Sequence, residues 1–293
     1  MSDGILVTGA SGILGDALLA SGLLPDAVGV VHLRSSQHPS VTLDLRAASA
    51  VSSMLAELRP RVVIHTVALT DVDVCERDPG TAFAVSAGTT DQLATWLAQN
   101  APETLFVYIS TDQVYAGEGP HAEERTQPLN VYGQAKRAGE LAAAQAPRQL
   151  TLRTNFFGHS EMRPSYTDWI ATTVRDGKDL RVDPTSSFSA LHLADLTRLI
   201  ALAVERGLEG TFNLGARDSM RKLEFARAVA AAATPAGEER VGPLEPDPGR
   251  APRPLDLRLD VSRIEAALGE SMPTMSDGVA HVHEELRQAE HAA

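Results

Sequence analysis

At 293 residues with 43% hydrophobic content, the chain can bury a sizeable core as one large domain or two unequal lobes. Its formal net charge of -12 argues against a nucleic-acid or anionic-membrane surface, and its one cysteine, Cys75, excludes an internal disulfide and a multi-cysteine metal site. Because neither a signal peptide nor a transmembrane run stands out, we expect a cytoplasmic protein with no nucleic-acid or membrane partner.

Short β-rich runs alternate with alanine- and leucine-rich stretches of helical period through the first half of the chain. Strands are expected at 5–10, 27–33, 41–45, 61–68, 104–110 and 149–154. A long helix over 81–99 precedes the fifth of them. This alternation predicts an α/β fold built on a doubly wound parallel sheet of the Rossmann type.

Beyond the sixth strand the rhythm becomes irregular, with a helix to about Asp176, a return to strand and helix in FSALHLADL, and one more strand in TFNLG. The proline- and glycine-rich segment 235–254 is either a linker or an ordered loop, and we favour the loop because an apolar pattern resumes in LRLDVSRIEAAL. We therefore expect a dinucleotide-binding domain and a smaller, mixed carboxy-terminal substrate-binding lobe. The domain spans 1–155 plus about 188–216, and the lobe spans about 156–187 and 217–293.

Gly9, Gly12 and Gly15 follow the first strand at spacings of three, in a loop that also holds Ser11 and leads into a helical stretch. The spacing differs from G-x-G-x-x-G, but both patterns allow a tight turn, a close approach of backbone to a pyrophosphate, and a helix N-terminus aimed at negative charge. Three glycines in a turn also recur by chance. The strand, loop and helix context favours dinucleotide binding over that alternative.

The end of the second expected strand, in VVHLRSSQH, carries no acidic residue that could bind the ribose 2′-hydroxyl of NAD. Arg34, Ser35 and Ser36 stand there instead and can donate hydrogen bonds to a 2′-phosphate. The alternative is an arginine that is merely solvated at the surface. We expect NADP as the cofactor, with NAD left open.

Thr111 and Asp112 follow the fifth strand, at the edge where ligands of an open α/β sheet bind, and Tyr132 and Lys136 come later in NVYGQAK. Their spacing of four places the tyrosine and the lysine on one face of a helix that begins near Asn130. Reduction of a carbonyl needs a proton donor, and a phenol with a pKa of about 10 needs a neighbouring ammonium to bring it toward the working pH. A tyrosine and a lysine four apart are often only an exposed helix pair, but their order after the glycine loop and Thr111 favours a catalytic set.

The chain resembles the extended short-chain dehydrogenase/reductase superfamily over nearly its whole length, and within it the dTDP-4-dehydrorhamnose reductase branch. The marks of the resemblance are TGASGILG, VVIHTVALTDVDVCERDP, YISTDQVYAG, PLNVYGQAKRAGE, LRTNFFG and, more weakly, RPLDLRLDVSRIEAALG. The resemblance implies that Thr111 hydrogen-bonds the substrate carbonyl and that Tyr132 delivers the proton. It also implies that Lys136 lowers the pKa of the tyrosine while holding the nicotinamide ribose.

The resemblance assigns further contacts with both ligands. Gly12, Ile13 and Leu14 would meet the pyrophosphate, Asp44 and Leu45 the adenine side, Val67, Ala68 and Leu69 the nicotinamide side, and Asp112 and Phe156 the substrate. Relatives usually carry Asn where this chain has Ser86, and the rhamnose enzymes favour Trp where it has Phe156. The resemblance therefore leaves the identity of the sugar open.

We expect NADPH-dependent reduction of the keto group of a nucleotide-activated sugar, foremost a dTDP-4-keto-6-deoxy sugar. One alternative is a sugar-nucleotide epimerase or epimerase-reductase, which retains or recycles its cofactor. Another is a non-catalytic NADP-binding regulatory subunit, since a fold can keep a ligand site after losing its chemistry. The expected partner is a nucleotide sugar, and a homodimer is left open.

Three further features have plainer interpretations. Cys75 follows DVDV after the fourth strand and is expected to be a small loop residue rather than a nucleophile. His281, His283 and His291 lie in a polar helical tail, where we expect no metal site. Arg153 lies at the end of the sixth strand and either anchors a substrate phosphate or pairs with a carboxylate.

Overall fold

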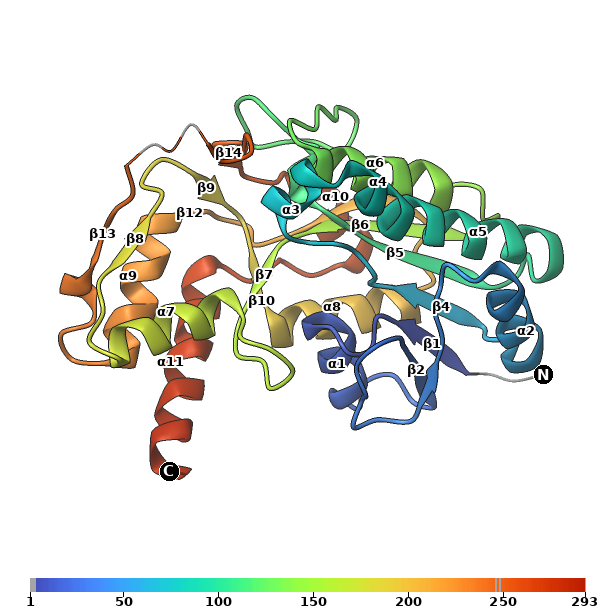
Figure 1. The fold of residues 1–293 in the computed structure, drawn as a ribbon, viewed down its shortest axis with the longest axis horizontal. Helices are drawn as coiled ribbons and strands as arrows, with labels where there is room; N and C mark the ends of the chain where they lie inside the picture. The colour runs from blue at the N-terminus through green and yellow to red at the C-terminus, as the bar shows by residue number, and fades with distance from the viewer. Residues whose placement is uncertain (1–3, 246, 248, 293) are drawn as a thin grey trace.

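A parallel sheet of seven strands forms the centre of the computed structural model, which describes residues 4–245, 247 and 249–292 (Figure 1). Its strands lie in the order β11-β6-β5-β4-β1-β2-β3. Their bounds are β1 Ile5–Thr8, β2 Ala27–Val31, β3 Ser40–Thr42, β4 Val62–His65, β5 Leu105–Thr111, β6 Gln149–Thr154 and β11 Gly210–Leu214. The expected doubly wound sheet is confirmed, and its strand order reverses between β1 and β4, where ligands of such sheets bind.

Helices cover both faces of this sheet (Figure 1). α2 (Ala48–Leu58), α5 (Thr89–Asn100) and α6 (Val131–Ala143) lie on one face, and α1 (Ile13–Ala20) and α8 (Leu193–Glu205) lie on the other. Successive strand residues alternate between the faces, so Leu6 packs with the first group whereas Ile5 and Val7 pack with the second. Both faces are apolar, as expected for a parallel sheet buried between helices.

The long helix expected over 81–99 begins earlier and includes a π-helical segment. The chain passes in order through α4 (Pro79–Phe83), the π-helix η1 (Ala84–Gly88) and α5. Asp78 caps the start by accepting a hydrogen bond from the Thr81 amide at 3.0 Å. Val85 in the π-helical segment and Thr89 just after it line the pocket described below, in keeping with the frequent occurrence of such segments at functional sites.

A short helix, α3 (Val72–Arg77), follows β4, where the sequence predicts a loop around Cys75. Asp71 caps this helix by accepting a hydrogen bond from the Val74 amide at 2.9 Å. Cys75 is a buried helix residue, and its thiol donates to the Leu69 carbonyl at 3.3 Å. The expected loop is therefore wrong, because the capping aspartate starts a helix there.

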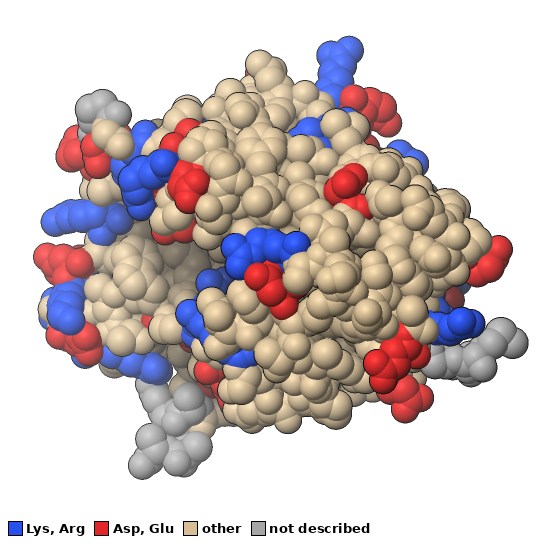
Figure 2. Space-filling view, turned by 45° about the vertical axis from the view of Figure 1, so that its right-hand side comes forward, with Lys and Arg blue, Asp and Glu red and all other residues tan. Residues whose placement is uncertain are grey.

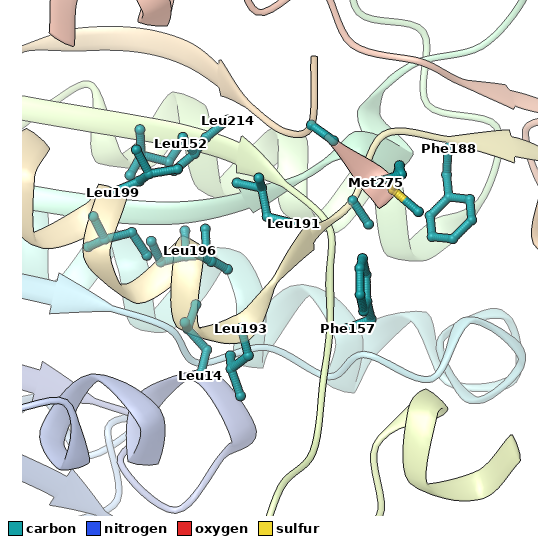
Figure 3. Close-up of a cluster of buried hydrophobic side chains, with 14 of the residues drawn as sticks. Leu14, Leu152, Phe157, Phe188, Leu191, Leu193, Leu196, Leu199, Leu214 and Met275 are labelled. Carbon is teal, nitrogen blue, oxygen red and sulfur yellow. The ribbon is translucent and has the colours of Figure 1, made fainter. Parts of the chain in front are cut away.

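A second group of elements lies to one side of the sheet (Figure 1). It consists of α7 (Tyr166–Arg175), α9 (Lys222–Ala233), α11 (Met275–Ala292) and the short paired strands β8 (Leu180–Val182), β13 (Val241–Pro243), β9 (Ser187–Phe188), β12 (Met220–Arg221), β14 (Asp256–Leu257), β7 (Phe156–Phe157) and β10 (Leu191–His192). α10 (Ser262–Leu268) lies beside β11 instead. One hydrophobic cluster runs from Leu14 and Leu196 on the sheet side to Phe157 and Met275 in the second group (Figure 3). The two groups of elements therefore share a core.

The proline- and glycine-rich segment 235–254 contains the short helix η3 (Glu238–Arg240) and β13. β13 pairs in parallel with β8, which ties this segment to the second group as an ordered loop. Residues 246 and 248 of the segment lie outside the described residues. Among the helices that the structure describes, none combines the length and the apolarity needed to cross a membrane.

Candidate active site

The loop between β1 and α1 is a tight turn that depends on its glycines. Gly9 has a φ of 77°, and a side chain there would lie 2.5 Å from the Thr66 hydroxyl. A side chain on Gly15 would meet the Gly9 carbonyl, so this glycine lets the helix pack against the loop. Gly12 precedes α1 with no side-chain cap. The first amides of the helix are therefore available to an anion, as a phosphate site requires.

One continuous pocket of about 840 Å³ runs along the carboxyl ends of the central strands. The space-filling view shows a hollow with lysine and arginine side chains at its rim (Figure 2). The predicted site residues that line the pocket are Gly9, Ser11, Gly12, Ile13, Leu14, Arg34, Asp44, Leu45, Val67, Ala68, Thr111, Asp112, Tyr132, Lys136 and Phe156. Gly15, Ser35 and Leu69 do not line it: Gly15 packs under the loop, Ser35 is exposed at the surface, and Leu69 packs against Cys75. Residues far apart in the sequence thus share one cavity.

Two arginines lie at the end of the pocket next to β2 and β3, namely Arg34 and Arg46. Arg46 donates to the two carboxylate oxygens of Asp44 at 3.0 Å and 2.8 Å, and these bonds lower the pKa of Asp44 to about 2. Arg34 makes no hydrogen bond or ion pair with the residues that the structure describes. At this end of the pocket the Arg34 guanidinium is therefore free to bind an anion, whereas the charge of the Arg46 guanidinium is neutralised by Asp44. Arg46 gave no sequence signal, because its role depends on the fold bringing β3 beside β2.

Thr111 and Tyr132 meet at the carboxyl end of β5, immediately before the short helix η2 (Asp112–Val114). Asn130 caps α6 by accepting a hydrogen bond from the Gly133 amide at 2.8 Å, which fixes the helical turn that carries Tyr132. Burial raises the pKa of Tyr132 to about 12, although its hydrogen bond with the Thr111 side chain lowers it. The phenol therefore holds its proton at neutral pH.

Lys136 is buried one turn along α6 from Tyr132. Its ammonium donates to the Ile109 carbonyl at 2.6 Å and lies 4.1 Å from the centroid of the Tyr108 ring. Burial lowers the pKa of Lys136 to about 7. The ammonium is held by β5, and burial has the largest effect on the pKa of the Tyr132 phenol.

Asp112 is buried at the same strand end, and Asn155 donates to its carboxylate at 2.7 Å. Burial raises the pKa of Asp112 to about 6, against the opposing effects of the Asn155 hydrogen bond and the positive charge of Lys222. The lining of the same pocket also includes Asn155, Phe156, Arg163 and Tyr166. Asn155 and Lys222 gave no sequence signal, because they reach the site from the turn after β6 and from the start of α9.

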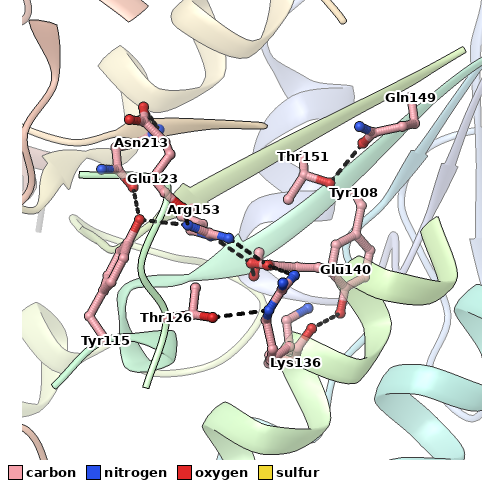
Figure 4. Close-up of polar contacts among 12 residues, drawn as sticks. Tyr108, Tyr115, Glu123, Thr126, Lys136, Glu140, Gln149, Thr151, Arg153 and Asn213 are labelled. Atoms are coloured by element: carbon pink, nitrogen blue, oxygen red, sulfur yellow. Dashed lines mark hydrogen bonds and ion pairs between the residues drawn. The ribbon is translucent and has the colours of Figure 1, made fainter. Parts of the chain in front are cut away.

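Arg153 belongs to a buried network of charged and polar groups (Figure 4). Its guanidinium donates to the two oxygens of Glu140 at 2.9 Å and 2.8 Å and to the Tyr115 hydroxyl at 2.8 Å. That hydroxyl donates in turn to Asn213 at 2.6 Å, and Ser110 donates to Glu140 at 2.6 Å. Of the two interpretations of Arg153 left open by the sequence, the structure supports the pairing with a carboxylate.

His281 and His283 do not line the pocket. His281 lies 3.5 Å from a carboxylate oxygen of Asp195 and packs its ring edge-on against His192. One potential ligand atom from each of these three residues lies within 4.8 Å of the others. His283 contacts a backbone carbonyl of α9, and the side chain of His291 lies outside the described residues. His281 therefore has an acidic neighbour on α8 that the sequence did not indicate.

The RmlD substrate binding domain family matches residues 3–288 of the chain. A Streptomyces antibioticus protein named probable dTDP-4,6-dihydroxy-2-methyloxan-3-one 4-ketoreductase is 33% identical over 233 residues, covering 76% of this chain and 75% of that protein. The methionine adenosyltransferase 2 subunit beta of Rattus norvegicus is 27% identical over 284 residues, covering 92% of this chain and 84% of that protein. A crystal structure of a hypothetical dTDP-4-dehydrorhamnose reductase from Sulfolobus tokodaii is similar with a TM-score of 0.82 at 28% identity, covering 94% of this chain and 98% of that one.

These similarities are not confined to the part of the fold that holds the seven-stranded sheet. The family match includes the glycine loop, the end of β5, α6 and nearly all of the second group of elements. The solved structure likewise covers almost the whole chain. The chain therefore belongs to the RmlD substrate binding domain family, within the extended short-chain dehydrogenase/reductase superfamily.

Proposed function

We propose that the protein uses NADPH to reduce the keto group of a nucleotide-activated sugar. The observation that carries the proposal is that Thr111, Tyr132 and Lys136 line the same continuous pocket as the glycine loop. A phosphate-binding loop and a buried proton donor in one cavity suit the reduction of a carbonyl. The ketoreductase name of the Streptomyces antibioticus relative supports this choice.

The residues present fit a dinucleotide. Gly9 permits the tight turn of the loop, where a side chain would collide with Thr66, and the uncapped start of α1 suits a pyrophosphate. Arg34 and Arg46, without an acidic residue at the end of β2, suit the 2′-phosphate of NADP, and NAD is the second candidate. When bound, the reduced dinucleotide supplies the hydride.

The chain's own residues handle the proton and the orientation of the carbonyl. Tyr132, with its pKa of about 12, keeps a proton on its hydroxyl at neutral pH and is the donor. The Thr111 hydroxyl holds the carbonyl oxygen beside that phenol, where negative charge develops. Lys136, with its pKa of about 7 and its hydrogen bond to β5, holds the ribose and exchanges protons with the phenol after turnover.

Within the nucleotide-activated sugars, the substrate that we propose is a dTDP-4-keto-6-deoxy sugar. Asp112 and Asn155 offer an acceptor and an amide to the sugar hydroxyls, next to the proposed site of reduction. Phe156 supplies an apolar wall at the same place, which suits a 6-deoxy carbon. The name of the Streptomyces antibioticus relative, a dTDP-linked 4-ketoreductase, supports this class.

We also propose the division into a dinucleotide-binding domain, 1–155 plus about 188–216, and a substrate-binding lobe, about 156–187 and 217–293. The positions of α8 and β11 in the sheet layers, and of α7, α9 and α11 in the second group, support it. α10 lies within the residues assigned to the lobe, but it packs beside β11 of the sheet.

A cytoplasmic location suits an NADPH-dependent reductase with a buried free cysteine. The residues that line the pocket all come from one chain, so the proposed site does not require a homodimer.

The test is NADPH consumption by the purified chain with a dTDP-4-keto-6-deoxy sugar. Wild-type protein should oxidise NADPH, and Tyr132→Phe should lower kcat by about 100-fold or more while NADPH still binds. Binding of NADPH without its oxidation by any nucleotide-linked keto sugar would overturn the proposal in favour of a non-catalytic subunit. Cofactor that stays bound through purification, together with interconversion of sugar epimers, would overturn it in favour of an epimerase.

A further inference from the structure

The start of α6 is joined to residues 251–253, a distant part of the chain that we call the clamp segment. The side-chain amide of Asn130 donates to the Pro252 carbonyl at 2.9 Å and to the side-chain oxygen of Gln113 at 3.1 Å. Its side-chain oxygen accepts the capping hydrogen bond from the Gly133 amide. Asn130 is only 1% exposed, so these three bonds satisfy a buried amide. The orientation of Asn130 that caps α6 therefore depends on the clamp segment.

The clamp segment is also bound to α3. Asp73, in the first turn of this helix, accepts hydrogen bonds from the Ala251 amide at 2.9 Å and from the Arg253 guanidinium at 2.7 Å. The same guanidinium donates to the Ala251 carbonyl at 2.8 Å, which closes the segment on itself. The hydrogen bonds from Arg253 and Ala251 lower the pKa of Asp73 to about 2. At neutral pH this contact is therefore a charge-assisted one.

α3 is in turn bound to the start of α6. The Glu76 carboxylate accepts a hydrogen bond from the Val131 amide at 3.2 Å. Glu76 is three residues along α3 from Asp73, so the two carboxylates lie on neighbouring positions of one helix face. Between them in the sequence, Cys75 packs in a small apolar cluster with Val131 and Tyr132. The clamp segment, α3 and the start of α6 are therefore joined in all three pairs.

These contacts converge on the residue that carries the proposed proton donor. The first amides of a helix have no partner within the helix, so other groups determine where the first turn lies. In α6 the amides of Val131 and Gly133, on either side of Tyr132, bind Glu76 and Asn130. Proton transfer requires the phenol within hydrogen-bond reach of the carbonyl oxygen, and a displacement of about 1 Å can lower a rate by about 100-fold.

We propose that the clamp segment positions the Tyr132 hydroxyl for proton transfer, acting through Asn130 and through Asp73 of α3; this role rests on the proposed function. Asn130, Asp73 and Arg253 do not line the pocket, so they are positioning residues that act through Tyr132. Loss of the clamp should lower kcat and leave cofactor binding nearly unchanged, because the glycine loop lies on other elements.

Asn130→Asp tests the bond between the clamp segment and the cap. Aspartate caps a helix as well as asparagine does, so the bond from Gly133 is kept, but a second oxygen then faces the Pro252 carbonyl. With NADPH and a dTDP-4-keto-6-deoxy sugar, kcat should fall by about tenfold while KM for NADPH stays within about twofold. A proportionate rise in KM for NADPH would contradict a role confined to Tyr132.

Replacement of Arg253 tests the bond to α3. Arg253→Gln should lower kcat by about fivefold, and Arg253→Lys should restore most of the activity because it keeps a positive charge for Asp73. Arg250→Gln is the matched control. Its guanidinium lies 4.0 Å from the same Asp73 oxygen, against 2.7 Å for Arg253, and its loss should leave kcat within about twofold.

Hydrogen exchange of the full chain with NADP⁺ provides a readout that does not depend on the sugar. In Arg253→Gln the amides of residues 131–134 should exchange about tenfold faster, whereas those of β5 should exchange as in the wild type. Faster exchange throughout the chain would indicate a general loss of stability and would overturn the positioning role.

The outcomes distinguish the clamp from the proposed function. Unchanged kcat and unchanged exchange in both Asn130→Asp and Arg253→Gln, in a chain that reduces the sugar nucleotide, would overturn the clamp alone. A wild-type chain that binds NADPH but reduces no sugar nucleotide would overturn the proposed function, and with it the role in proton transfer.

Discussion

The ammonium of Lys136 lies 4.1 Å from the centroid of the Tyr108 ring, while the Tyr108 hydroxyl donates to the Lys136 carbonyl at 3.3 Å. Tyr108 of β5 and Lys136 of α6 thus contact each other in two places. The ring face carries the negative part of the aromatic quadrupole, so it stabilises the charged form of a lysine whose pKa burial lowers to about 7. We therefore expect Tyr108 to act through Lys136 as a positioning residue.

Two replacements of Tyr108 should distinguish the contribution of its ring from that of its hydroxyl. Tyr108→Leu is expected to lower kcat by about fivefold, because it removes the surface under the ammonium, whereas Tyr108→Phe should stay within about twofold. The ring favours the protonated lysine, so its loss should move the limb of the kcat/KM pH profile that belongs to Lys136 toward lower pH. Identical pH profiles for wild type and Tyr108→Leu would contradict this role.

Arg34 and Arg46 should set the preference between the two dinucleotides. Arg34→Ala is expected to raise KM for NADPH by about tenfold and to leave KM for NADH within about twofold, because only NADPH carries the 2′-phosphate. Arg46→Ala should have a larger effect, since it also frees the charge of Asp44 beside that phosphate. The measurement is kcat/KM with each dinucleotide, with Arg217→Ala as an exposed control. Equal losses for NADH and NADPH would speak against a phosphate contact.

Glu140 should matter far more for stability than a surface glutamate. Glu140→Gln leaves the Arg153 guanidinium buried without its carboxylate, and it should lower the free energy of unfolding by about 3 kcal/mol or more. Glu209→Gln breaks the exposed pair with Arg148, at 2.7 Å, and should cost less than about 1 kcal/mol. Urea unfolding of the two variants measures both values. Similar losses in the two variants would show that the buried network is not the stabilising element.

Asp112 should make the stability depend on pH. Its pKa in the folded chain, about 6, is higher than the ordinary value of 3.8, so the folded state binds this proton more tightly than the unfolded state. The stability that the folded chain gains from binding this proton is complete below about pH 4 and is lost as the pH rises through about 6. The free energy of unfolding of Asp112→Asn, relative to wild type, should therefore rise by up to about 3 kcal/mol between about pH 4 and pH 7. Urea unfolding across this range measures it, and a constant difference would refute the shifted pKa.

The parts of the fold and of the site that could be predicted from the sequence have local signals. Alternating strand and helix patterns predicted the sheet, and Asn130 marked the start of the helix that places Tyr132. Asp71 caps α3 in the structure, whereas the sequence predicts a loop there. The positions of Gly9 and Gly15 in the loop were predicted, although Gly15 packs under the loop rather than lining the pocket.

The residues that could not be predicted act through tertiary placement. Arg46 gains its role from the pairing of β3 with β2, and Asn155 gains its role from the turn that brings it to Asp112. Tyr166 reaches the pocket only because α7 packs on Phe225. The direction of the pKa shift of Tyr132 depends on burial, which spacing along a helix does not give. Periodicity predicts the elements, whereas these contacts depend on how the elements pack.

The hydrophobic cluster shared by the sheet and the second group makes the molecule a single thermodynamic unit. Leu14 of α1, beside the glycine loop, and Phe225, which stacks on Tyr166 of α7, belong to the same cluster. Heat should therefore melt both ends of the pocket in one calorimetric transition. A ligand that binds at either end stabilises the whole of that unit, so NADP⁺ alone should protect the α7 end against proteolysis.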